Sequence, residues 1–251
     1  MQKSYDEIQP QPTSLRFFTL FVVLSQILGV LVVVMVGVWM GHFHGGFGWM
    51  ENPGLEFNYH PLFMVLGLVF LYGDAMLAYR VFRYERKLYI KIVHTCLHAG
   101  AIIFAAVGLK AVFDSHNLAK PKPIANLYSW HAWMGLATVI LFASQFVFGF
   151  VSYLWPKLSQ NARELYMPLH RFWGMAIYVM AIATAFMGMI EKIGFIGLTS
   201  SLQDPERLLT NMLGLALLCL GLVVIYVVSH PDYKRQPLAE EQTLQLQEYQ
   251  E

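Results

Sequence analysis

The length of the apolar runs constrains this chain more than any other feature. The first run, residues 17–40, contains no charged residue. A helix needs about 20 apolar residues to cross the hydrocarbon core of a bilayer. Five further runs of suitable length follow, at 59–79, 88–113, 128–154, 167–190 and 207–229. The sequence therefore predicts an all-α integral membrane protein with six transmembrane helices joined by short connectors.

The composition agrees with a membrane protein. Apolar residues make up 57% of the chain and charged residues 13%, about half the charged share of an ordinary soluble domain. The formal net charge is +1, so we expect no nucleic-acid partner. The first run is too long for the core of a signal peptide and is interpreted as a retained helix. Cys96 and Cys219 lie inside apolar runs, which favours buried structural roles over a disulfide.

Lysine and arginine are distributed unevenly between the two ends of the predicted bundle. Twelve lie on the side that carries both termini, and five lie on the other side. The positive-inside rule makes the richer side cytoplasmic, and an even number of helices agrees with this orientation. We therefore expect a cytoplasmic N-terminal tail (1–15), a six-helix transmembrane domain (16–230) and a cytoplasmic C-terminal tail (231–251).

Histidines inside the predicted helices are the main candidates for function, because ionisable side chains are rare within membranes. His94 and His98 lie one helical turn apart, so they share a face of the third helix. By depth, His60 and His131 fall in the non-cytoplasmic half of helices 2 and 4. In the cytoplasmic half, either histidine of helix 3 can face His170 of helix 5.

Paired histidines on facing helices suit a haem that has one imidazole on each face. His94 and His98 cannot clasp one haem between them, because side chains at i and i+4 lie only about 5–6 Å apart on one surface. Such a pair can bind zinc, but neither an HExxH motif nor a carboxylate accompanies it on that helix. Two six-coordinate haems, one in each half, favour electron transfer across a core of about 30 Å over oxygen binding.

Six segments carry a resemblance to a known family: FNYHP (57–61), AMLAYRVFR (75–83), KIVHTCLHAG (91–100), VFDSHN (112–117), NLYSWHAWMG (126–135) and MPLHRFWG (167–174). In their order and spacing, the chain resembles the cytochrome b561 family of transmembrane ascorbate-dependent reductases. The animal chromaffin-granule type and the duodenal ferric-reductase type look nearest. The resemblance implies that helices 2–5 form a four-helix bundle holding two b-type haems (iron protoporphyrin IX).

The resemblance also implies the haem iron ligands. These are His60 with His131 on the non-cytoplasmic side and His94 with His170 on the cytoplasmic side. His98 is then a residue that packs beside the inner haem or supports its ligand. Further residues match family positions in contact with the haems: Arg80, Lys87, Asn126, Tyr128, Ser129, Glu191 and Lys234.

Substrate positions follow from the same resemblance. Lys87, Lys91 and Arg163 match positions that bind ascorbate, an anion that charge-assisted hydrogen bonds from Lys and Arg can hold. His116 and Asn117 match positions that meet the electron acceptor or a metal ion at the outer face. Two features lie outside the motifs: Asp74, a carboxylate within helix 2 that needs a partner, and the pair His42 and His44, for which we expect a solvated loop.

The expected function is electron transfer from cytosolic ascorbate through two haems to monodehydroascorbate, which regenerates ascorbate on the non-cytoplasmic side. The alternative is a ferric reductase that makes Fe²⁺ at the same face. The expected setting is the lipid bilayer of a secretory or endolysosomal vesicle or of the plasma membrane, with a homodimer as in the family. A transporter or channel without haem and a haem-bearing sensing subunit are the competing classes.

Overall fold

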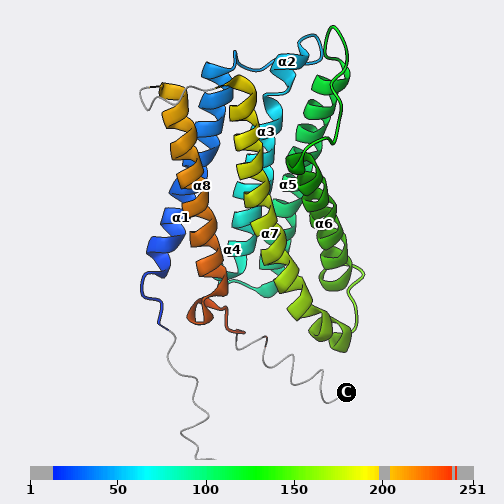
Figure 1. Ribbon diagram of the computed structural model, residues 1–251. Helices are drawn as coiled ribbons and strands as arrows, with labels where there is room; N and C mark the ends of the chain where they lie inside the picture. The colour runs from blue at the N-terminus through cyan, green and yellow to red at the C-terminus, as the bar shows by residue number, and fades with distance from the viewer. Residues whose placement is uncertain (1–13, 198–203, 239–240, 242–251) are drawn as a thin grey trace, which may run out of the picture.

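Six helical spans run back and forth along one bundle axis in the computed structural model of this chain (Figure 1). The structure describes residues 14–197, 204–238 and 241, and contains no strand among them. The start of the first span and the end of the sixth lie at the same end of the bundle (Figure 1), here called the terminal end; the opposite end is the distal end. Most of both predicted tails, residues 1–13, 239–240 and 242–251, lies outside the described residues.

The six predicted spans are all confirmed as helices. In chain order they are α1 (Phe18–Val38) with a π-helical turn η2 (Trp39–Phe43); α3 (Tyr59–Val65), η3 (Leu66–Leu71) and α4 (Tyr72–Val81) in one continuous span; α5 (Lys87–Asn117); α6 (Trp130–Tyr153); α7 (Gln160–Ile196); and α8 (Pro205–Ser229). Two further short elements are the helix α2 (Pro53–Glu56), at the start of the second span, and the 3₁₀ turn η4 (Pro231–Tyr233).

The second to fifth spans form the predicted four-helix bundle. α5 packs along α3, η3 and α4, and α6 packs along α7. α1 and α8 pack on each other at one side of this bundle (Figure 1). The buried core runs through both parts and includes Val32 of α1, Tyr72 of α4, Tyr178 of α7 and Leu217 of α8. The four inner helices are therefore held together from one side by the first and last helices.

Two helices extend well past their apolar runs. α7 begins at Gln160, seven residues before the predicted start, and continues through Pro168. α5 ends at Asn117, four residues beyond the predicted end. An apolar run marks the part of a helix that lies in lipid. The backbone hydrogen bonds of the helix can continue beyond that run into polar residues. A proline inside a helix only removes one such bond and bends the helix locally.

The prediction of buried cysteines is wrong for Cys96, which is exposed on α5, while Cys219 is half-buried. On a membrane helix an apolar position can face lipid as easily as protein, because lipid tails are as apolar as leucine. Both cysteines are free. Asp74 finds its partner on the neighbouring helix: Gln26 Nε2 of α1 donates to Asp74 Oδ1 at 2.7 Å.

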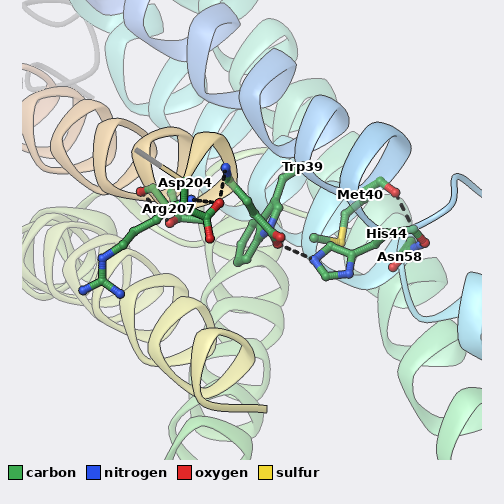
Figure 2. A network of polar contacts seen from close by, with 8 residues as sticks. Trp39, Met40, His44, Asn58, Asp204 and Arg207 are labelled. Carbon is green, nitrogen blue, oxygen red and sulfur yellow. Dashed lines mark hydrogen bonds and ion pairs between the residues drawn. The ribbon is translucent and has the colours of Figure 1, made fainter. Parts of the chain in front are cut away.

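A polar network closes the distal end between α1, α8 and the start of α3 (Figure 2). Trp39 Nε1 donates to Glu206 Oε1 at 2.7 Å, and His44 Nε2 lies 2.9 Å from the same oxygen. Asn58 Nδ2 donates to the carbonyls of His44, at 3.0 Å, and Gly46, at 2.6 Å. The network therefore joins the first and last spans to the segment that leads into His60.

The expectation of a solvated loop is wrong for His44. Its side chain is 14% exposed and paired with Glu206, whereas His42 is exposed as expected, although it lies in the π-helical turn η2 and not in a loop. Burial and the nearby Lys192 lower the pKa of His44, and together they outweigh the opposite effect of Glu206. Sequence periodicity gave no sign of this contact, because the carboxylate comes from a helix more than 150 residues away.

Candidate functional site

The first histidine pair lies at the distal end. His60 is on the first turn of α3 and His131 is on the first turn of α6. Their ring centres are 6.0 Å apart and the ring planes are inclined by 83°. Both rings are half-buried between the helices. The structure thus brings together the two histidines that the sequence placed at this depth.

The second pair lies toward the terminal end. His94 of α5 and His170 of α7 have ring centres 6.4 Å apart, with planes inclined by 61°. His98 does not take the place of His94 in this pair. It is buried with its ring centre 4.4 Å from that of His94, and it packs against Tyr72 and Phe142. Its Nδ1 has no hydrogen-bond partner.

The spacing of both pairs fits a single metal ion between the rings. A bond from a metal to an imidazole nitrogen is about 2 Å long, and the ring centre lies about 1.2 Å beyond that nitrogen. Two rings on opposite sides of one ion therefore have centres about 6.4 Å apart. The observed 6.0 Å and 6.4 Å match this value. Imidazoles in this arrangement fit the two faces of a haem.

Hydrogen bonds at Nδ1 orient three of the four rings. The contacts are His60 Nδ1 to Gly108 O (3.1 Å), His131 Nδ1 to Thr184 O (3.0 Å) and His94 Nδ1 to Ala75 O (2.7 Å). A carbonyl can only accept, so each contact fixes the ring proton on Nδ1 and leaves the Nε2 lone pair for a metal. His170 differs, because its Nδ1 lies 3.0 Å from a side-chain atom, Gln145 Nε2.

The two pairs are separated along the same two helices. On α5, Gly108 at the level of the distal pair follows His94 by 14 residues. On α7, Thr184 follows His170 by the same 14 residues. At about 1.5 Å per residue, the two levels lie about 21 Å apart along the bundle. Such a separation places one site in each half of a bilayer core about 30 Å thick.

Gly188 of α7 allows the ring of His131 to approach. A Cβ atom at this position would lie 2.6 Å from His131 Cε1, whereas a Cβ at Gly194 on the same helix would meet nothing within 4 Å. We expect Gly188→Ala to lower the thermal stability of the purified protein, because forced overpacking costs about 1–3 kcal/mol. Gly194→Ala is the matched control and should gain only the helix propensity of alanine. Equal melting temperatures for the two variants would contradict the close approach.

The predicted outer-face residues form two small groups. His116 Nδ1 lies 3.0 Å from Asn126 Oδ1, and Asn126 Nδ2 donates to Asn117 Oδ1 at 2.9 Å. The ring of Tyr128 stacks on that of His116 with centres 6.5 Å apart. The last residues of α5 and the segment between α5 and α6 therefore bring these four predicted residues next to one another.

The other outer-face group adjoins His131. Ser129 caps the first turn of α6 and donates to Glu191 Oε2 of α7 at 2.9 Å. Beside this contact opens a pocket of about 410 Å³, lined mostly by apolar side chains together with His131, Ser129 and Glu191. An apolar hollow next to a metal-ligating type of side chain is the chemistry that a haem ring requires.

Cations gather beside the second pair. Lys91 Nζ donates to the carbonyl of Tyr153 at 2.9 Å, and Tyr153 Oη donates to the carbonyl of Arg163 at 3.1 Å. Lys87, Lys157 and Arg163 all lie close enough to repel the Lys91 ammonium. The ring of Tyr153 is 5.3 Å from that of His170. These four cations, called here the cationic cluster, stand next to the second pair and suit an anion.

The three remaining predicted haem contacts, Arg80, Lys87 and Lys234, lie in different surroundings. Lys87 opens α5 within the cationic cluster. The Arg80 guanidinium donates to the carbonyls of Val228 and of His230, the latter at 3.1 Å, and so ties α4 to the end of α8. Lys234 is exposed, just past η4. The structure thus brings Lys87, Lys91 and Arg163 together, but gives Arg80 main-chain partners and leaves Lys234 at the surface.

The sequence reasoning missed three polar residues at the second pair: Gln145, Tyr153 and Tyr166. Gln145 Nε2 donates to the carbonyl of His170 at 2.7 Å, and Tyr166 Oη donates to Gln145 Oε1 at 3.4 Å. A signal for Gln145 was present, since it is a lone amide inside the apolar run 128–154. A buried polar group needs a partner, so an amide at that depth indicates an interhelical contact.

Six membrane spans with a histidine pair in each half of an inner four-helix bundle define the architecture of a multi-pass membrane cytochrome. The chain belongs to the cytochrome b561 family, since the family model for eukaryotic cytochrome b561 matches residues 59–196. The matched region contains both histidine pairs and Gln145.

Relatives in animals are similar over nearly the whole chain. The transmembrane ascorbate-dependent reductase CYB561 of Mus musculus is 44% identical, over 94% of this chain and 91% of its own length. A putative homologue in Caenorhabditis elegans is 40% identical, over 92% and 90%. The plasma membrane ascorbate-dependent reductase CYBRD1 of Xenopus laevis is 40% identical, over 88% and 78%.

Proposed function

We propose that this protein is a transmembrane ascorbate-dependent oxidoreductase that carries electrons from its terminal face to its distal face. The observation that carries the proposal is the pair of histidine sites, each spaced for one iron and separated by about 21 Å along α5 and α7. The names of the animal relatives as ascorbate-dependent reductases support the same activity. The terminal face, which carries more Lys and Arg, is cytoplasmic in this proposal.

His60 with His131 and His94 with His170 would each hold one haem b through Nε2. A haem with two histidine ligands supplies one-electron redox chemistry without an open position for oxygen. The carbonyls of Gly108, Thr184 and Ala75 hold the ligand rings in place. The other residues that would contact the two haems are those predicted from the sequence: Arg80, Lys87, Asn126, Tyr128, Ser129, Glu191 and Lys234.

The cationic cluster would bind ascorbate as a monoanion, with Lys87, Lys91 and Arg163 as its direct partners. Charge-assisted hydrogen bonds from ammonium and guanidinium groups are about twice as strong as neutral ones. The cluster lies against Tyr153, whose ring adjoins His170, so a bound anion stands close to the second pair. A bound ascorbate monoanion would give up one electron toward the second pair and one proton to the surrounding water, leaving monodehydroascorbate, while the residues of the cluster hold the anion in place.

The acceptor at the distal face is monodehydroascorbate in this proposal, with His116 and Asn117 at the point of contact. A ferric reductase is the second candidate, because an imidazole such as that of His116 is a common metal ligand. The protein would lie in a secretory or endolysosomal vesicle membrane or in the plasma membrane, and would form a homodimer.

Purified protein tests the proposal through its visible spectrum. Two haems per chain, both reduced on addition of ascorbate, are expected; a colourless preparation would overturn the proposal and favour a transporter or channel. Vesicles that contain ascorbate and reconstituted protein then decide the acceptor. Monodehydroascorbate outside should be consumed faster than a ferric chelate, and the reverse order would favour the ferric reductase.

A further inference from the structure

We propose that Gln145 is a positioning residue for His170, and that its side-chain amide tunes how readily the group bound at the second pair takes up an electron. The inference rests on the proposed function, because it needs a haem between His94 and His170. It is carried by a comparison of the two sites, which α6 and α7 build in a reciprocal way.

At the distal site, α6 supplies the ring and α7 supplies its support. A Cβ at Gly188 would lie 2.6 Å from His131 Cε1, so the glycine admits the ring against α7. One turn earlier, the carbonyl of Thr184 lies 3.0 Å from His131 Nδ1. The side chain of Thr184 points elsewhere, since its Oγ1 donates to the carbonyl of Met180 at 2.8 Å. The support at this site is therefore entirely main chain.

At the second site the two helices exchange roles. α7 supplies His170, and a Cβ at Gly149 of α6 would lie 3.0 Å from its Cε1. One turn before that glycine stands Gln145, whose Nε2 lies 3.0 Å from His170 Nδ1 and donates to the His170 carbonyl at 2.7 Å. Gln145 therefore has the position at the second site that Thr184 has at the distal site. It contacts the histidine ring through its side-chain amide, whereas Thr184 does so through its main-chain carbonyl.

The difference matters because a side-chain amide carries both an NH₂ donor and an oxygen acceptor, and it can present either one to the ring. When Nε2 donates to Nδ1, the ring proton of His170 lies on its own Nε2, which must be free to bind a metal. An amide that has turned over presents Oε1 to Nδ1–H and leaves the ring Nε2 free. The turned amide loses its bond to the His170 carbonyl and must also move away from it, because Oε1 in the place of Nε2 would bring two acceptor oxygens within 2.7 Å. That carbonyl keeps its helical partner in α7. Metal binding at His170 is thereby coupled to the orientation of Gln145.

The acceptor at Nδ1 also affects the electron affinity of the bound iron. A stronger acceptor makes the imidazole a more basic ligand and stabilises the oxidised metal, and hydrogen bonding of this kind is an established means of tuning potential. Gln145 is a neutral acceptor that substitution can remove or make anionic. Three of the four rings use carbonyls that no substitution removes, so only His170 can be adjusted in this way.

A redox titration of three full-length variants tests the inference. We expect Gln145→Leu to raise the midpoint potential of one haem and Gln145→Glu to lower it, each by about a tenfold change in the reduction equilibrium, or about 59 mV. Thr138→Val is the control on the same helix. The buried hydroxyl of Thr138 donates to the carbonyl of Met134 at 2.7 Å and contacts neither histidine pair, so both midpoints should stay at their wild-type values.

The outcomes separate this inference from the proposed function. Unshifted midpoints in both Gln145 variants, with two haems per chain, would overturn the role of Gln145 and leave the proposed function standing. Shifts in the same direction would also overturn it. Loss of one haem from Gln145→Leu alone would support it, because His170 has lost its anchor, and loss of both haems would count against it. A His170→Ala protein that keeps two haems would instead contradict the proposed function.

Discussion

Replacing His94 with alanine is expected to lower the haem content from two per chain to one and to abolish reduction by ascorbate. The ring centres of His94 and His170 lie 6.4 Å apart, which is the spacing of two imidazoles on opposite sides of one metal ion. Without one imidazole the second site loses one of its two proposed ligands, whereas the distal pair about 21 Å away keeps both. Haem quantification and the difference spectrum of the purified variant measure the result.

His98→Ala is the natural control, because the two histidines lie one turn apart on the same helix. His98 packs against Tyr72 and Phe142. We expect this variant to keep two haems and to lose some stability, since its removal leaves a cavity. A His98→Ala protein that lacks one haem, beside a His94→Ala protein that keeps both, would reverse the assignment of the ligand.

Neutralising Lys91 is expected to raise the apparent KM for ascorbate about tenfold or more without changing the haem content. A hydrogen bond to a charged group contributes about 1.5–3 kcal/mol, and 1.4 kcal/mol corresponds to a factor of ten in affinity. Lys91→Gln is preferred to alanine, because an amide can still donate to the carbonyl of Tyr153, which Lys91 Nζ contacts at 2.9 Å. Steady-state reduction at several ascorbate concentrations gives the KM.

Lys122→Gln makes the same change of charge at the distal end, where the side chain is exposed, and should leave the KM unchanged. Added salt should raise the KM of the wild-type protein and affect Lys91→Gln less, because ions screen exposed charges. A Lys91→Gln variant with unchanged KM and unchanged salt dependence would exclude the cationic cluster as the ascorbate site.

Much of the fold was predictable because the bilayer leaves few choices. Within it every backbone group must be bonded inside the segment, so each apolar run becomes a helix. The predicted runs 17–40 and 59–79 accordingly appear in α1 and in the span that ends with α4. The helix ends were less predictable. The polar start of α7 at Gln160 lies before the apolar run, where lipid no longer marks the helix.

The candidate site was predictable in part for the same reason. Depth along a helix follows from counting residues, which placed His60 level with His131 and His170 within reach of helix 3. Counting cannot tell which way a side chain points. Cys96 was expected to be buried and is exposed, and His44 was expected to be solvated and is held by Glu206.

Hydrophobic length and local periodicity are properties of each segment alone, so they were enough to predict a six-helix membrane protein with histidines at two depths. The folded bundle was needed to establish the ring separations of 6.0 Å and 6.4 Å, the packing of His98 on Tyr72 and the contact of Gln145 with His170. These depend on how each helix is rotated about its axis and on which neighbour it meets. Rotation is set by packing between helices, where small residues such as Gly149 and Gly188 allow close approach.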